Sequence, residues 1–169
     1  MITSNKPADS YWDIQSEYIF FVKGHLSQWW YSPFVYSGIE FNCAEQFMMY
    51  QKAVLMNDIE TAAAIMKTDD PKEQQRLGRI IRNFESNLWD KVKYQMVYLG
   101  NFLKFYQNPE LREILFKTNG KLLVEVNPND SVWGIALAID NPDRLDRTKW
   151  KGENLLGQVL TNVRKDLQK

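Results

Sequence analysis

The pattern of apolar and polar positions changes along the chain from short strand-like runs to helical spacing. Residues 1–15 are mostly polar, and Tyr18–Val22 is an aromatic and β-branched run that is typical of a buried strand. Residues 35–41 are predicted to form a hairpin that turns at Ser37-Gly38. The first quarter of the chain is therefore predicted to be strand and loop.

From Ala44 onward the apolar residues recur at helical spacing. The predicted helices cover about residues 44–56, 58–67, 71–83, 86–106 and 108–119. Their start signals are Asn42, Asp70 followed by Pro71, and Ser86, and Asn119-Gly120 closes the last. For the long fourth helix we expect an inward stripe of Trp89, Val92, Met96, Leu99, Leu103 and Tyr106.

The last third of the chain returns to strand character before a terminal helix. A strand is predicted over 121–126, a short extended piece over 133–137 and a polar loop over 142–152. The helix from Asn154 is amphipathic, and we expect Arg164 to face water. Because no repeat or linker interrupts these elements, the prediction is a polar lead-in, 1–17, and one mainly helical α+β domain, 18–169.

Composition narrows the kinds of partner. A chain of 169 residues with 44% hydrophobic residues fits one core. Its 21 basic and 21 acidic residues cancel, so the net charge does not attract a polyanion. A local basic cleft is still possible. With no signal peptide and no apolar run of about 18 residues, we expect a cytoplasmic protein without a membrane partner.

The single cysteine and the single histidine limit the chemistry. Cys43 alone excludes an internal disulfide, and Cys43 with His25 is too small a set for a Cys/His zinc site. We expect no metal and no cofactor. Triad catalysis would have to run through His25, whose loop position favours a structural role. Acid–base chemistry therefore falls to carboxylates, lysine or tyrosine.

Two positions of the first helix share a face. Lys52 follows Glu45 by seven residues, so the side chains project within about 20° of each other, with Cα atoms about 10 Å apart. This spacing suits two groups that flank one ligand, and it equally suits a solvated polar face.

Other polar residues also have two readings. Asp130, three residues before Trp133-Gly134, places a carboxylate near an indole, but an Asx-turn or a cap explains it too. Arg79 and Lys104 can bind phosphate or can be ordinary surface charges. Since the chain has no Walker loop and no Gly-x-Gly-x-x-Gly, side chains and helix termini would have to hold any nucleotide.

Six blocks of the sequence, taken in order, resemble the NADAR (YbiA-like) family of N-glycosidases over about residues 18–167. The blocks are Ser27–Phe34, Cys43–Ala53, Leu77–Arg79, Lys104–Asn108, Val124–Gly134 and Gly152–Gly157. The resemblance implies a mainly helical α+β fold and hydrolysis of a ribosyl C–N bond. The implied substrate is a small phosphorylated ribosyl molecule such as a riboflavin-pathway intermediate. The alternatives are removal of ADP-ribose from guanine in nucleic acid, or ADP-ribose binding without catalysis.

The resemblance also assigns roles to residues. The implied catalytic residues are Glu45, Asp130, Trp133 and Lys52. The implied substrate-binding residues are Trp89, Arg79, Lys104, Asn108, Gly134 and Asn154. Either carboxylate can stabilise an oxocarbenium-like sugar, or a neutral Lys52 can form an imine with it.

Three departures from the family pattern bear on the substrate. Residues 27–31 read Ser-Gln-Trp-Trp-Tyr where many relatives have Ser-Asn-Phe-Tyr-Pro, and residues 43–46 read Cys-Ala-Glu-Gln in place of Val-Glu-His. Ala136 stands where glycine is common. The implied catalytic residues are unaffected.

Overall fold

The chain folds into two units in this computed structural model, which describes residues 12–169. The terminal unit comprises residues 12–27 and 110–169, and the central unit comprises residues 28–109. The described elements are helices and a few short strands, which confirms the predicted mainly helical α+β class.

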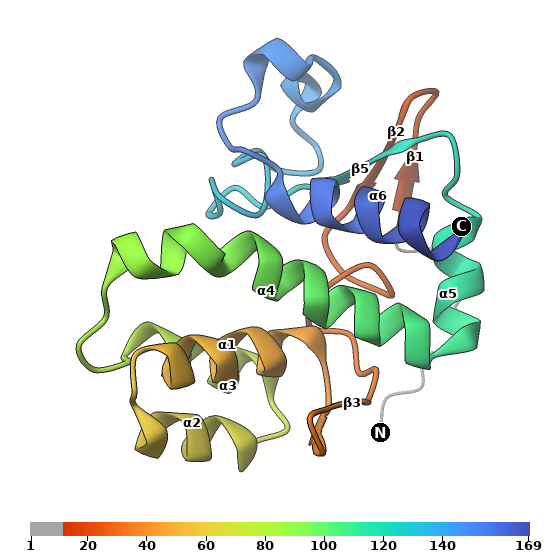
Figure 1. Cartoon of the computed structure of the whole chain (residues 1–169). Coiled ribbons are helices and arrows are strands. Elements are labelled where there is room, and N and C mark those ends of the chain that lie inside the picture. The colour runs from red at the N-terminus through yellow and green to blue at the C-terminus, as the bar shows by residue number, and fades with distance from the viewer. Residues whose placement is uncertain (1–11) are drawn as a thin grey trace. The chain divides into compact units, whose positions relative to one another are not determined.

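The central unit contains a hairpin and four helices (Figure 1). Its elements are β3 (Phe34–Tyr36), β4 (Ile39–Phe41), α1 (Ala44–Leu55), α2 (Ile59–Met66), α3 (Pro71–Arg79) and α4 (Ser86–Gln107). The predicted hairpin is confirmed, since β3 and β4 pair antiparallel and the turn residues Ser37 and Gly38 have φ of 51° and 78°. Helix α1 packs against α2, α3 and α4.

An aromatic cluster forms part of the core of the central unit. Phe34, Phe41 and Phe47 are buried together, with ring centroids 5.1–5.9 Å apart. Gly100 of α4 lies against this cluster, and a Cβ there would be 2.7 Å from the Phe47 ring. The cluster therefore holds α1 and α4 close together.

The terminal unit contains a small mixed sheet and two α-helices. Its elements are β1 (Trp12–Ile14), β2 (Tyr18–Phe21), α5 (Pro109–Phe116), β5 (Leu122–Glu125), the 3₁₀ helices η2 (Pro142–Leu145) and η3 (Arg147–Lys149), and α6 (Leu155–Leu167). Strand β2 is central, antiparallel to β1 and parallel to β5.

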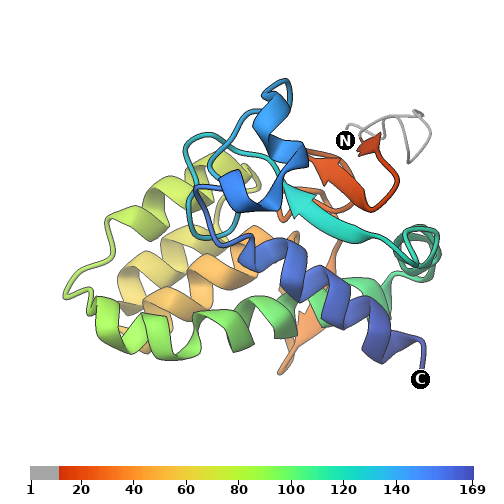
Figure 2. The same cartoon turned by 90° about the horizontal axis from the view of Figure 1, so that it is seen from above.

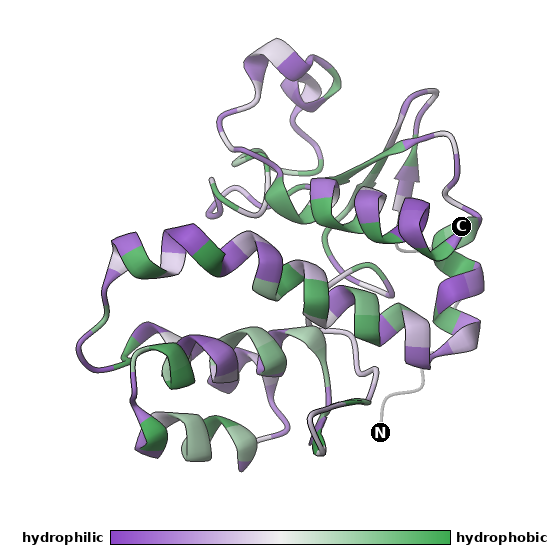
Figure 3. Cartoon of the chain, viewed as in Figure 1, coloured by the Kyte–Doolittle hydropathy of each residue, from purple (hydrophilic) through white to green (hydrophobic). Residues whose placement is uncertain are grey.

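Helix α6 packs along β5, as Figure 2 shows. Its hydrophobic residues alternate with hydrophilic ones along the helix (Figure 3). Gly157 permits the close approach, because a Cβ there would lie 2.0 Å from the carbonyl oxygen of Leu123. The predicted inward residues Leu156, Val159, Leu160 and Val163 are buried.

Two predicted helix starts are wrong in their capping residue. Helix α1 is capped by Cys43, whose sulfur accepts a hydrogen bond from the backbone N of Gln46, and not by Asn42. The Asn42 backbone N instead donates to Gln46 Oε1 at 2.8 Å. In α4 the predicted cap Ser86 is the first helical residue, and Glu85 occupies the cap position.

Helix α3 ends at Arg79, four residues before the predicted end at Asn83. Asp58 accepts hydrogen bonds from the backbone N and the guanidinium of Arg82, which directs the chain away from the helix. Asn83 then has a left-handed φ of 53°.

The predicted inward stripe of α4 is only partly right. Trp89 is buried, but Tyr106 is exposed, and Leu99 and Leu103 are only partly buried at the aromatic cluster. The buried positions also include Gly100, Asn101, Lys104 and Phe105. Two of these residues are polar and one is glycine, so the spacing of apolar residues in the sequence did not mark them as buried.

Three expectations for the terminal unit are wrong. Residues Trp12–Ile14 form β1 although they fall in the predicted lead-in 1–17, of which residues 1–11 lie outside the described part. Residues 133–137 form no strand, because Ala136 has a φ of 53°. Arg164 is buried, since its guanidinium donates to Thr118 and to the Lys121 carbonyl.

Candidate functional site

Helix α1 places the first predicted catalytic pair in the central unit. Glu45 lies in its first turn, where the helix dipole favours a carboxylate, and its backbone N donates to the Gln28 carbonyl at 3.0 Å. The side chain of Glu45 is only 2% exposed, and Lys52 is partly buried. The interpretation of Glu45 and Lys52 as part of a solvated polar face is therefore wrong.

The amine of Lys52 lies among a carbonyl and two aromatic rings. Its Nζ donates to the Gly78 carbonyl at 2.8 Å and lies 4.4 Å from the centroid of the Phe84 ring and 6.0 Å from that of Trp89. Burial lowers the pKa of Lys52, Glu45 opposes this shift, and Arg79 adds to it. More of the amine is neutral near pH 7 than in an exposed lysine, which favours nucleophilic chemistry.

Trp89 and Arg79 reach this neighbourhood from other helices of the central unit. Trp89 is buried in the first turn of α4, and Arg79 is exposed at the end of α3. The positive charge of Arg79 contributes to the lowered pKa of Lys52.

Two other predicted binding residues of the central unit are enclosed by protein. Lys104 has no exposed surface, so it is not an ordinary surface charge, and burial lowers its pKa to about 7, against a smaller opposing effect of Cys43. Asn108 donates to the carbonyls of Pro33 and Lys104 at 3.0 and 2.8 Å. Contact of either residue with substrate stays a prediction.

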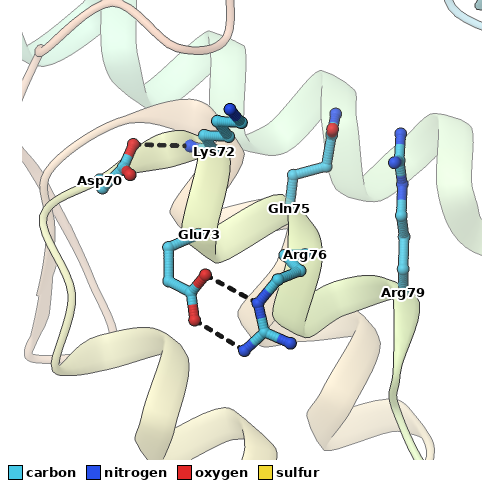
Figure 4. Close-up of a pocket in the computed structure, with 6 residues that line it drawn as sticks. All are labelled: Asp70, Lys72, Glu73, Gln75, Arg76 and Arg79. Carbon is cyan, nitrogen blue, oxygen red and sulfur yellow. Dashed lines mark hydrogen bonds and ion pairs between the residues drawn. The ribbon is translucent and has the colours of Figure 1, made fainter.

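A surface hollow of about 410 Å³ follows one side of α3 (Figure 4). Lys72, Gln75 and Arg79 extend from the helix in the same direction there. Arg76 instead forms two hydrogen bonds with Glu73, at 2.7 and 2.8 Å. Lys72 and Arg79 are therefore the cations of the hollow that remain able to meet an anion.

Asp130 lies in a tight turn of the terminal unit. Its Oδ1 accepts hydrogen bonds from the backbone N of Val132 and of Trp133, at 3.0 and 2.8 Å. The turn explanation of this aspartate is therefore right, and it leaves Oδ2 available for chemistry. The carboxylate is partly exposed, as is the Trp133 indole.

Gly134 and Asn154 hold the backbone beside this turn. A Cβ at Gly134 would lie 3.0 Å from the Glu125 carbonyl and 3.2 Å from that of Asp130. The Asn154 side chain accepts from the Glu125 N and donates to the Leu123 carbonyl, both at 3.0 Å. Because this amide pairs with β5 as another strand would, it fixes the start of α6.

The predicted catalytic residues thus fall into two groups. Glu45 and Lys52 act on each other within the central unit, and Asp130 and Trp133 share one turn of the terminal unit. That both groups serve one substrate stays a prediction from the resemblance.

Sequence reasoning missed two groups that contact Lys52. One is the Gly78 carbonyl, a backbone group that no residue pattern reveals. The other is Phe84, and an aromatic residue between Asn83 and Glu85 in a polar connection was the available signal.

The described residues contain neither a metal-binding cluster nor a membrane-spanning helix. Within 12–169 there is no group of three or more His, Cys, Asp or Glu side chains that could hold a metal ion. None of the helices in that range has the length and apolar character needed to cross a bilayer.

The chain matches one family model and is similar in sequence to several known proteins. Residues 11–168 match the family described as NADAR domain. N-glycosidase R617 of Acanthamoeba polyphaga mimivirus is 42% identical over 129 residues, which cover 76% of each chain. Protein irg-1 of Caenorhabditis elegans is 38% identical over 131 residues, covering 76% of this chain and 62% of that protein, so the match spans less than two thirds of its length.

A solved structure has a similar fold. The NMR structure of the E. coli protein YbiA aligns with a TM-score of 0.75 and 26% sequence identity. The alignment covers 95% of this chain and 90% of YbiA.

Proposed function

Since the chain belongs to the NADAR domain family, we propose that it is an N-glycosidase that hydrolyses the C–N bond of a ribosyl-phosphate-type substrate. A phosphorylated intermediate of riboflavin biosynthesis is the kind of substrate that we propose. An N-glycosidase is a hydrolase that acts on N-glycosyl bonds, and this is the enzyme class of the chain.

The observation that carries the proposal is the buried carboxylate of Glu45, whose charge acts on the amine of Lys52. Cleavage of a ribosyl C–N bond builds positive charge on the sugar ring. A carboxylate held near C1′ in a site with little water stabilises that charge more in the transition state than in the ground state. Glu45 fits this role because it is fixed in the first turn of α1 and almost fully buried.

Lys52 supports a covalent version of the same reaction. Its neutral amine forms a bond to C1′ as the base leaves with a proton, and opening of the ribose ring then gives an imine. Water attacks the imine and releases the sugar phosphate and the free amine. The lowered pKa of Lys52 supports this route, since only the neutral amine can attack.

The other predicted residues have supporting roles in this proposal. Asp130 orients or deprotonates water, and Trp133 and Trp89 position the base or the ribose. Arg79 is the best candidate for the substrate phosphate, because its guanidinium is exposed in the hollow along α3.

The test of the function is a substrate panel read by mass spectrometry. The protein is incubated with ribosylamine phosphates, ADP-ribose conjugates and DNA that carries ADP-ribosylated guanine. We expect release of base and ribose phosphate from the first class. Release only from the ADP-ribosylated DNA would support the alternative substrate, and no release from any class would contradict the proposal.

Borohydride trapping separates the two routes. Reduction during turnover should leave a sugar adduct on Lys52 that survives digestion and is identified by mass spectrometry. Turnover without an adduct on Lys52 would favour direct hydrolysis assisted by the carboxylates.

A further inference from the structure

Phe84 is a large apolar side chain that remains 42% exposed on the segment between α3 and α4. Its ring lies over the amine of Lys52, with Nζ 4.4 Å from the ring centroid. Trp89 forms a second and more distant wall at 6.0 Å. The candidate nucleophile of α1 is therefore covered by a ring that no predicted role explains.

The segment around Phe84 is held on both sides. Asp58 accepts from the backbone N of Arg82 at 2.9 Å, and the Glu85 backbone N donates to the Met56 sulfur at 3.3 Å. Between them, Asn83 turns the chain through a left-handed conformation with φ 53°. These anchors fix the position of Phe84, so its place over Lys52 follows from the local fold.

We propose that Phe84 is a positioning residue that shields the amine of Lys52 from water and holds it against the Gly78 carbonyl. The role of Lys52 as nucleophile rests on the proposed function, but the shielding can be measured without any substrate. Through Phe84, the segment after α3 thus influences the reactivity of Lys52 on α1.

Two effects of the ring oppose each other. Exclusion of water disfavours the charged amine, whereas the negative face of the ring attracts it. Burial is the largest cause of the lowered pKa of Lys52, and the charged groups that act on the amine are Glu45 of α1 and Arg79 of α3. Shielding is therefore expected to outweigh the attraction by the ring.

Competitive acetylation measures this shielding directly. The full chain without substrate is pulsed with acetic anhydride across a pH series, and mass spectrometry follows each lysine. We expect Phe84→Ala to raise the pKa of Lys52, seen as a shift of the midpoint of its labelling profile to higher pH, whatever the change in its maximal labelling rate. Phe84→Leu keeps most of the apolar cover and should shift the pKa less.

Ile80→Ala is the matched control, because Ile80 is an exposed apolar residue of the same connection. It should leave the labelling of Lys52 unchanged, and Lys67, an exposed lysine of the same unit, provides an internal reference in every sample. Melting temperatures check that each variant is folded.

The proposal is overturned if Phe84→Ala leaves the pKa of Lys52 unchanged or lowers it, or if Phe84→Leu or Ile80→Ala shifts it as much as Phe84→Ala does. Because labelling needs no turnover, a failed glycosidase assay does not affect this result. A shift confined to Lys52 in Phe84→Ala, together with no activity on any substrate, would retain the shielding and refute the proposed function alone.

Discussion

Single polar residues are buried at positions where the chain needs them for structure or chemistry. Glu45 and Lys104 are almost entirely enclosed, and Arg164 is buried with three hydrogen bonds to Thr118 and Lys121. Enclosing a charged group costs free energy unless partners compensate or the group becomes neutral. Lys104 is the clearest case of the second outcome, because burial lowers its pKa to about 7.

The lowered pKa of Lys104 predicts a dependence of stability on pH. A lysine in the unfolded chain has a pKa of about 10.5, so between pH 7 and 10 the unfolded state binds a proton that the folded state does not. This group therefore makes the fold more stable as pH rises through that window. We expect Lys104→Met to flatten the rise, measured as the melting temperature at pH 7 and at pH 9.5. An equal rise in both proteins would contradict the burial of a neutral amine.

Asp130 is predicted to have separable structural and catalytic roles. Asp130→Ala removes the acceptor for two backbone N–H groups and should destabilise the fold by about 1–2 kcal/mol. Asp130→Asn keeps an acceptor oxygen but removes the charge, so it should melt near the wild-type temperature and lose activity. Wild-type turnover in Asp130→Asn would restrict this residue to its turn.

The loop between β5 and α6 contains two non-glycine residues with left-handed backbone. Ala136 and Asn154 both have left-handed φ, of 53° and 54°. Asn154 compensates with hydrogen bonds to β5 through its side chain. Ala136 has no such side chain, so its Cβ carries the steric cost of the left-handed conformation, which a glycine would not have.

Ala136→Gly is therefore expected to stabilise the protein. Relief of the left-handed strain outweighs the added freedom of the unfolded chain and should raise the free energy of unfolding by about 0.5–1 kcal/mol. Chemical denaturation measures the change. Ala138→Gly, two residues further on at a position without positive φ, should be destabilising by a similar amount. A loss of stability in Ala136→Gly would show that the strain is compensated elsewhere.

The sequence predicted whole elements better than it predicted their ends. The hairpin turn at Ser37-Gly38 was readable because only a few residues adopt its backbone, and α1 was readable from its apolar spacing. The end of α3 was not, because it depends on the hydrogen bonds of Asp58 with the distant Arg82. The inward face of α4 was obscured since Gly100, Asn101 and Lys104 are buried without being apolar.

The sequence points to the residue types of the candidate site, but it does not predict their contacts. Spacing placed Glu45 and Lys52 on one face, but only the fold shows that this face is buried. The Gly78 carbonyl and the Phe84 ring come to Lys52 from the segment that joins α3 to α4, and no local pattern encodes that approach.

For the whole molecule, the balance of 21 basic and 21 acidic residues leaves recognition to local groups. Each of the two units has its own hydrophobic cluster, and each carries one of the predicted catalytic carboxylates. In the function that we propose, residues such as Arg79 capture the substrate and the pair on α1 cleaves the bond, without help from a long-range field.

The turnover of Glu45→Gln shows whether the buried carboxylate of α1 takes part in bond cleavage. Release of base from the best ribosyl phosphate substrate is followed by mass spectrometry in the wild type, in Glu45→Gln and in Glu40→Gln, an exposed glutamate of the same unit. We expect Glu45→Gln to lose at least about a hundredfold in kcat with little change in melting temperature, and Glu40→Gln to match the wild type. Near-wild-type turnover in a folded Glu45→Gln would contradict the account.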